Sequence, residues 1–289
     1  MGINIHALNF LMYASKKKKF GSTATIGRQT ITYLKAKEIK NILHLPKEVD
    51  YGTWCEKLLI DNFHASKVDS FDYSDYEGCT FTHDMNNPLP PAITTPNNKY
   101  DTIIDIGSFE HIYNLPQAFK NISTMCKDGG IIIHILPANN MNGHGFWQFS
   151  PELFYSLYSE SNGYTETEVF FADHGDTKYW YNVKKPENGN RCYVSDKKKI
   201  FVMIRTKKIK EFTHENVQES HFIQAWNQKN SNVGNGLIKK LEGFAKRHES
   251  FFPFMYYIYI QLHFIKNPEK LSGRNKNLVK RKVTDWMNI

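Results

Sequence analysis

The sequence has few cysteines and no long apolar run, and both absences limit the kind of protein it encodes. The four cysteines lie far apart and form no CxxC pair: Cys55, Cys79, Cys126 and Cys192. We therefore expect no disulfide framework and a reducing, cytoplasmic location. The most apolar segment, residues 251–265, is too short to cross a bilayer comfortably. No apolar core or small-residue cleavage site follows the lysine run 16–19, so no signal peptide is expected.

Metal-ligand spacing is missing as well, although the chain contains 12 histidines. Neither HxxxH nor HExxH occurs, and these are the spacings that place two imidazoles on one helix face. His83 and Asp84 could converge with His111, but without a diagnostic pattern. The sequence predicts no metal site.

The charge is unbalanced, with a net value of +8 at pH 7. Much of the excess lies in four segments: residues 16–19, 197–199, 205–210 and 274–282. Such segments can bind nucleic acid or an anionic membrane. No Arg-Gly or RNP-like aromatic pattern accompanies them, so we expect solvated loops and edge strands and no specific nucleic-acid site.

Hydrophobic residues make up 40% of the 289 residues, which indicates a folded globule with a substantial core. Short β-branched or apolar runs predict strands at 23–26, 67–72, 79–84, 100–106, 131–137, 164–173 and 197–207. A helix is predicted from about Leu115 to Cys126, and Gly129-Gly130 breaks it. Strands separated by helices of this kind predict an α/β fold with a doubly wound, mostly parallel sheet.

Two parts are expected along the chain. Residues 1–210 carry the strand and helix alternation, whereas residues 211–289 are rich in aromatics and have a helical pattern. We expect the second part to be a helical C-terminal appendage, packed on or beside the first. Its aromatic and basic residues could also contact a membrane surface.

Polar groups gather where the predicted strands end. Ligands of doubly wound sheets bind beyond the carboxyl ends of the strands, so these ends predict a site. The polar and small residues there are Gly27, Arg28, Gln29, Asp72, Asp84, Met85, Gly107, Ser108, Glu110, His111, Asn139 and Asn140.

The order of elements, together with "HDMN" at 83–86, "YDTIIDIGSFEHI" at 100–112 and "MCKDGGIIIHILP" at 125–137, resembles class I S-adenosylmethionine-dependent methyltransferases. The resemblance covers roughly residues 20–208. "GHGFWQFSPELFY" at 143–155 is similar to a block in bacterial members linked to glycan (polysaccharide) or secondary-metabolite biosynthesis.

The first turn departs from the resembled family, which usually has an acidic-Gly-x-Gly-x-Gly turn after its first strand. Here "TATIGRQTITY" offers Gly27 alone, followed by the bulky Arg28 and Gln29. Bare backbone at such a turn lets a cofactor approach closely. Arg28 could instead pair with the cofactor carboxylate as a fork.

The resemblance implies S-adenosylmethionine as cofactor and S-adenosylhomocysteine as product. It implies that Asp72 accepts hydrogen bonds from the ribose hydroxyls, although Asp69 or Asp75 could be the partner instead. Asp84 would accept from the adenine amino group beside Met85, or simply form an Asx turn.

Gly107 and Ser108 are expected near the amino-acid end of the cofactor. On the acceptor side we expect His111 or His144 as catalytic base, with Glu110 beside His111, because imidazole can take a proton near neutrality. His134 alternates within an apolar strand and is expected to be a hydrogen-bonded core residue. Aromatics near the "GHG" turn could stack on a sugar or aromatic acceptor: Phe146, Trp147, Phe149 and Tyr155.

The predicted function is methyl transfer to an oxygen or nitrogen of a small molecule or sugar-containing acceptor. A catalytically silent methyltransferase-like binding protein is the nearest alternative. A nucleic-acid methyltransferase would carry an Asn-Pro-Pro-Tyr-like motif, which the sequence lacks. An enzyme acting at a membrane surface on a lipid-linked acceptor is the third alternative.

Overall fold

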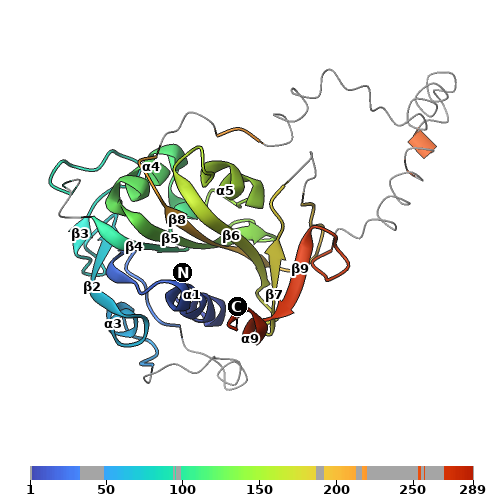
Figure 1. Cartoon of the computed structure of the whole chain (residues 1–289), viewed down its shortest axis with the longest axis horizontal. Coiled ribbons are helices and arrows are strands. Elements are labelled where there is room, and N and C mark those ends of the chain that lie inside the picture. Colours follow the sequence, from blue (N-terminus) through green and yellow to red (C-terminus); the bar gives the residue numbers. More distant parts are fainter. Residues whose placement is uncertain are drawn as a thin grey trace.

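The structure is a computed structural model. It describes residues 2–32, 49–93, 95, 99–186, 192–212, 217–219, 253–254, 257 and 270–288. A nine-stranded sheet in the order β3-β2-β1-β4-β5-β8-β6-β7-β9 forms the centre of this part (Figure 1). The strands are β1 Gly21–Ile26, β2 Ala65–Asp72, β3 Phe81–Thr82, β4 Tyr100–Ile106, β5 Cys126–Asn139, β6 Tyr164–Asp173, β7 Tyr179–Val183, β8 Ile200–Lys208 and β9 Leu278–Lys282.

The first five strands run parallel to their neighbours, and β8 joins β5 in the antiparallel direction. The register aligns Ile26 of β1 with Phe71 of β2 and with Asp105 of β4. The three strands therefore end at the same edge of the sheet. This edge is where the sequence predicts the ligand site.

Helices cover both faces of the sheet, as Figure 1 shows. On one face lie α4 (Leu115–Met125) and α5 (Pro151–Leu157), and on the other lie α1 (Ile5–Lys17), α3 (Glu56–Phe63) and α9 (Val283–Trp286). Each group packs its apolar side against a separate buried cluster. The predicted doubly wound α/β sheet is confirmed.

Local sequence explains how α4 begins. The Asn114 side chain accepts from the backbone N–H of Gln117 at 3.4 Å, and Pro116 occupies the first turn, where a missing N–H costs nothing. A short 3₁₀ turn, η2 (Phe109–His111), joins β4 to this helix. The turn places Glu110 and His111 at the carboxyl edge of the sheet.

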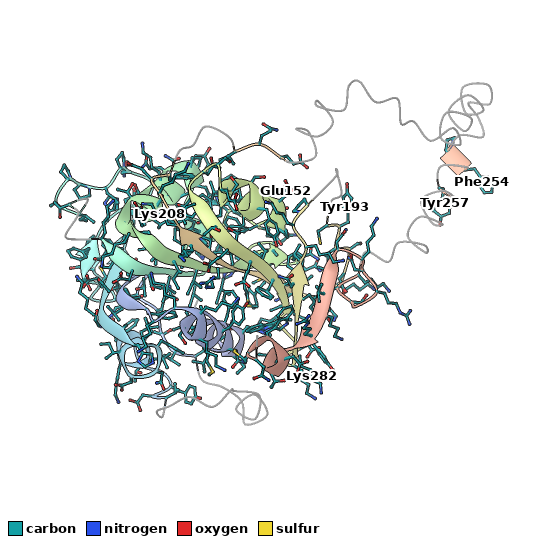
Figure 2. All side chains as sticks on the ribbon, in the orientation of Figure 1. Glu152, Tyr193, Lys208, Phe254, Tyr257 and Lys282 are labelled. Carbon is teal, nitrogen blue, oxygen red and sulfur yellow. The ribbon has the colours of Figure 1, made fainter. Side chains whose placement is uncertain are left out.

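Residues 205–210 were expected to be solvated, but residues 205–208 belong to β8, which is an inner strand of the sheet. Arg205 and Lys208 are each 2% exposed. The Lys208 ammonium, labelled in Figure 2, donates to the carbonyls of Ser123 and Cys126 at 2.9 Å each. Its charge thereby satisfies carbonyls at the end of α4. The expectation of a solvated edge strand is wrong for these two residues.

The end of the chain joins the sheet. β9 pairs with β7 in the antiparallel direction, so residues 278–282 form a strand where a helical pattern was expected. Most of residues 213–269 lie outside the described part, and so does the helical appendage expected there. The division at residue 210 and the expected membrane contact remain predictions. Among the described residues, no helix is long and apolar enough to cross a membrane.

Candidate active site

The ends of β1 and β4 are joined by side chains that bond to one carbonyl. Ser108 Oγ donates to the carbonyl of Ile26 at 2.7 Å, and Gln29 Nε2 donates to the same oxygen at 2.9 Å. The backbone N–H of Ser108 donates to Asp105 Oδ1 at 3.0 Å. The structure therefore brings the predicted residues Gln29 and Ser108 together at the edge of the sheet.

Gly27 occupies the turn after β1 with a φ of 75°, in the left-handed region. A Cβ added here would meet Ser108 Oγ at 2.6 Å, which is closer than real contacts allow. Both the positive φ and the lack of space for a side chain require glycine at this position. One glycine thus keeps the turn narrow where the resembled family uses several.

Asp72 lies at the end of β2 beside this turn. Its carboxylate accepts from the backbone N–H of Arg28 at 3.1 Å and from that of Tyr73 at 2.7 Å. The competing Asp69 lies in the middle of β2, where its carboxylate accepts from Tyr100 Oη and from the Lys67 ammonium at 2.8 Å each. The geometry favours Asp72 over Asp69 as the carboxylate available at the edge.

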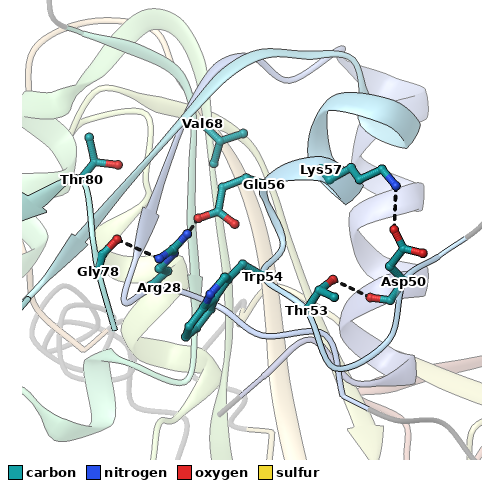
Figure 3. A pocket seen from close by; sticks show the side chains of 9 residues that line it. All are labelled: Arg28, Asp50, Thr53, Trp54, Glu56, Lys57, Val68, Gly78 and Thr80. Atoms are coloured by element: carbon teal, nitrogen blue, oxygen red, sulfur yellow. Dashed lines mark hydrogen bonds and ion pairs between the residues drawn. The ribbon is translucent and has the colours of Figure 1, made fainter. Parts of the chain in front are cut away.

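The Arg28 side chain points into a separate cavity of about 530 Å³, drawn in Figure 3. Its guanidinium pairs with Glu56 Oε1 at 2.8 Å and donates to the carbonyls of Glu77 at 2.6 Å and Gly78 at 2.8 Å. It also lies 4.5 Å from the centre of the Trp54 ring. The guanidinium is thus already engaged, so the expected fork to a cofactor carboxylate would require these contacts to break.

Asp84 and Met85 follow β3 and take different environments. The Asp84 carboxylate accepts from the backbone and side-chain amides of Asn86 at 2.9 and 2.7 Å and from Asn87 Nδ2 at 3.0 Å, which is an Asx turn. Met85 is buried, and Asn121 Nδ2 donates to its carbonyl at 3.2 Å. A contact of this pair with adenine stays a prediction.

Glu110, His111 and His144 lie together although the sequence separates His144 from the pair. Each offers a ligand atom within 4.8 Å of the other two. His144 Nε2 is 3.5 Å from Glu110 Oε1, and the two imidazole ring centres are 5.4 Å apart. The sequence analysis placed all three residues on the acceptor side of the site, but their direct contact depends on how the loop after β5 folds back onto η2, which no local pattern records.

The loop that carries His144 is fastened to Glu110 through the backbone. The N–H of Phe146 donates to the carbonyl of Glu110 at 2.6 Å. Gly145, with a φ of 79°, lies so close that an added Cβ would meet that carbonyl oxygen at 2.6 Å. His144 is therefore held against the 3₁₀ turn by main-chain contacts.

Burial dominates the electrostatics of the cluster. Glu110 is fully buried, and this burial, together with the charge of Asp105, raises the pKa of its carboxyl to about 8. Partial burial and the neighbouring His144 lower the pKa of His111. Neither carboxylate oxygen of Glu110 has a hydrogen-bond partner among the described residues.

A buried chain of polar groups lies behind the cluster. Asp105 Oδ2 is 2.8 Å from His134 Nδ1, and His134 Nε2 is 2.6 Å from Tyr158 Oη. This confirms that His134 is a hydrogen-bonded core residue. Sequence reasoning did not select Asp105, yet an aspartate inside the apolar run "TIIDI" was the signal that could have found it.

Exposed aromatic rings border the cluster. Tyr113 is 74% exposed and Phe146 68%, and their ring centres are 6.3 Å apart. Trp147, 6.5 Å from Tyr113, donates its indole N–H to the carbonyl of Ile112 at 2.9 Å. Phe149 and Tyr155, by contrast, are buried in the core. Phe146 and Trp147 thus remain available to stack on a ligand, whereas Phe149 and Tyr155 do not.

A family model described as a methyltransferase domain matches residues 49–197, more than half of the chain. The chain belongs to this methyltransferase family. The predicted class is confirmed, and the matched residues include β2 to β6 with the Glu110–His144 cluster. No curated protein matches the sequence.

Solved structures similar to this methyltransferase-family chain have low sequence identity to it. TehB from Haemophilus influenzae is 14% identical with a TM-score of 0.38, over 69% of this chain, which spans 62% of TehB. YcgJ from Bacillus subtilis is 9% identical with a TM-score of 0.40, over 72% of this chain and 100% of YcgJ. An O-methyltransferase of a Brevibacillus brevis polyketide synthase, solved with S-adenosyl-L-homocysteine, is 12% identical with a TM-score of 0.38, over 70% and 72% of the two chains.

Proposed function

We propose that the protein transfers the methyl group of S-adenosylmethionine to an oxygen or nitrogen of a small molecule or glycan precursor. The observation that carries the proposal is the shared edge of β1, β2 and β4 in a methyltransferase-family chain. At this edge the close turn at Gly27, the Asp72 carboxylate and the Glu110–His144 cluster lie on neighbouring elements.

The cofactor would bind over the first half of this edge. Gly27 and Gly107 both take the left-handed backbone conformation at this edge, and Ser108 follows Gly107 and bonds to the carbonyl of Ile26. The Asp72 carboxylate would accept from the two ribose hydroxyls. Asp84 and Met85 would flank the adenine ring. Gln29 stabilises the turn, because its buried side chain donates a hydrogen bond to the carbonyl of Ile26.

The acceptor would approach from the other half, over Glu110 and His144. The exposed rings of Tyr113, Phe146 and Trp147 suit a planar ring or the apolar face of a sugar. The acceptor atom attacks the methyl carbon in line with the departing sulfur, which keeps the electron pair of the broken bond. Positioning supplies most of the rate, and His111 or His144 would take the acceptor proton.

The test is formation of S-adenosylhomocysteine by the purified protein in the presence of panels of sugars, nucleotide sugars, phenols and amines. Activity with one class supports the proposal, and we then expect His144→Ala or His111→Ala to lower kcat while cofactor affinity changes less than about threefold. Groups that act in the transition state contribute little to cofactor binding. Cofactor binding without product in any panel would instead favour the silent binding protein, for which the engaged Arg28 guanidinium is the supporting observation.

A further inference from the structure

We propose that Glu110, His111 and His144 form a binding site for one divalent transition-metal ion. The three residues come from the η2 turn and from the loop after β5, so the site exists only in the folded chain. Ion binding by itself does not depend on the proposed methyl transfer. The role suggested below for the bound ion does rest on it.

The spacing of the donor atoms fits an ion after small rotations. The three ligand atoms lie within 4.8 Å of one another, and bonds of about 2.1 Å to a tetrahedral ion would bring them to about 3.4 Å. His111 is exposed, so its ring is free to turn about its side-chain bonds. The closest pair, His144 Nε2 and Glu110 Oε1, is already 3.5 Å apart.

Three buried atoms of the cluster that could bind a metal ion make no hydrogen bond within the described structure. Both carboxylate oxygens of Glu110 and the Nε2 atom of His144 are shielded from solvent without a hydrogen-bond partner there. Buried polar groups without partners are rare and costly. A cation between these atoms would satisfy all three at once.

The backbone holds two of the ligands together. The N–H of Phe146 and the close approach of Gly145 fix the loop on the carbonyl of Glu110, and the N–H of His144 donates to the carbonyl of Met141 at 3.1 Å. The backbone that follows His144 is thus fixed relative to Glu110, and His144 itself is bonded within its own loop. A pair of ligands arranged in advance loses less conformational entropy on binding an ion.

The ligand set indicates the class of ion. Two imidazoles and one carboxylate suit Zn²⁺, Mn²⁺ or Fe²⁺, whereas Mg²⁺ and Ca²⁺ prefer oxygen alone. Three protein ligands leave a position open, as in catalytic zinc sites. An acceptor hydroxyl bound there would lose its proton to solvent more easily, and its oxygen would then attack the methyl carbon. In that case the histidines would serve as ligands and not as bases.

The test is a Zn²⁺ titration of chelator-treated protein against a competing chromophoric chelator, followed by Co²⁺ substitution and absorption spectroscopy. We expect one ion per chain, bound at least about tenfold more weakly by His111→Ala, His144→Ala and Glu110→Gln. His64→Asn is the matched control and should bind as the parent does. It removes an exposed imidazole elsewhere at a φ of 60°, which asparagine tolerates.

His111→Ala is the decisive variant because the His111 side chain is exposed, so its removal is expected to change stability little. Equal Zn²⁺ affinity in the parent and in His111→Ala would overturn the proposal. A thiolate charge-transfer band in the Co²⁺ spectrum would overturn it too, since the ion would then be on a cysteine. The titration contains neither cofactor nor acceptor, so its failure leaves the proposed methyl transfer standing, and failure of methyl transfer leaves the ion site standing.

Discussion

Gly143 and Gly145 flank His144 and share the same backbone conformation, with φ values of 83° and 79°. Their surroundings differ. A Cβ at Gly143 meets nothing within 4 Å, whereas a Cβ at Gly145 meets the Glu110 carbonyl oxygen at 2.6 Å. A substitution at Gly143 therefore tests backbone strain alone, whereas one at Gly145 adds a steric clash.

We expect Gly143→Ala to lower the free energy of unfolding by about 1–2 kcal/mol, the cost of a left-handed alanine. Gly145→Ala should cost more, because the loop must also move away from Glu110. Urea unfolding of the two variants measures the difference. Equal losses would show that the loop does not press on Glu110 as described.

Some features of the site follow from a local sequence pattern, and others depend on the folded chain. Glu110 and His111 were found because a buried strand ends at them. The contact of His144 with Glu110 could not be predicted, because it depends on how the loop after β5 folds back. The present contacts of the Arg28 guanidinium could not be predicted for a similar reason, because Glu56, Glu77 and Gly78 come from segments without a pattern that links them to Arg28.

At the scale of elements, α1 is attached to the sheet by a buried histidine. His6 Nδ1 accepts from Trp180 Nε1 at 3.3 Å, so its Nε2 carries the hydrogen and donates to the carbonyl of Asp173 at 3.0 Å. The pKa of His6 is lowered to about 4, mainly by burial and also by nearby His174, although Asp173 and Asp176 raise it. The helix is therefore docked with a neutral imidazole.

This docking predicts a pH dependence of stability. Between pH 6.5 and 4 the unfolded state binds the proton and the folded state does not, so the free energy of unfolding falls as pH is lowered through this window. The loss should approach about 3 kcal/mol from His6 alone. Chemical unfolding at several pH values measures it, with His6→Gln expected to have a shallower slope. Identical slopes in the two proteins would contradict this assignment.

The C-terminal elements β9 and α9 contribute to the core through Trp286. This side chain is 8% exposed, and its ring centre lies 5.1 Å from that of Phe170 in an edge arrangement. We expect Trp286→Ala to lower the free energy of unfolding by about 3–5 kcal/mol. The matched control is Tyr76→Ala, at a ring that is 92% exposed, with an expected change within about 0.5 kcal/mol. A loss below 1 kcal/mol for Trp286→Ala would mean that α9 does not pack on the sheet.

At the scale of the whole molecule, the central sheet was predictable and its outer edge was not. β4 and β6 have the bounds that their β-branched and apolar runs predicted. β7 and β9 were missed, because a pairing between residues 179–183 and 278–282 leaves no local pattern in either segment. Non-local pairing is set by tertiary packing, which periodicity does not record.

We propose that S-adenosylmethionine binds at the shared edge of β1, β2 and β4. Isothermal titration calorimetry with S-adenosylmethionine and with S-adenosylhomocysteine tests it most directly. We expect saturable binding of both, weakened by about 1.5–3 kcal/mol in Asp72→Ala, because the ribose would lose a charged hydrogen-bond acceptor. Asp69→Ala serves as the matched control and should leave the affinity within a few-fold. Absence of binding at millimolar concentration, or equal weakening by the two substitutions, would show that the cofactor does not bind at this edge through Asp72.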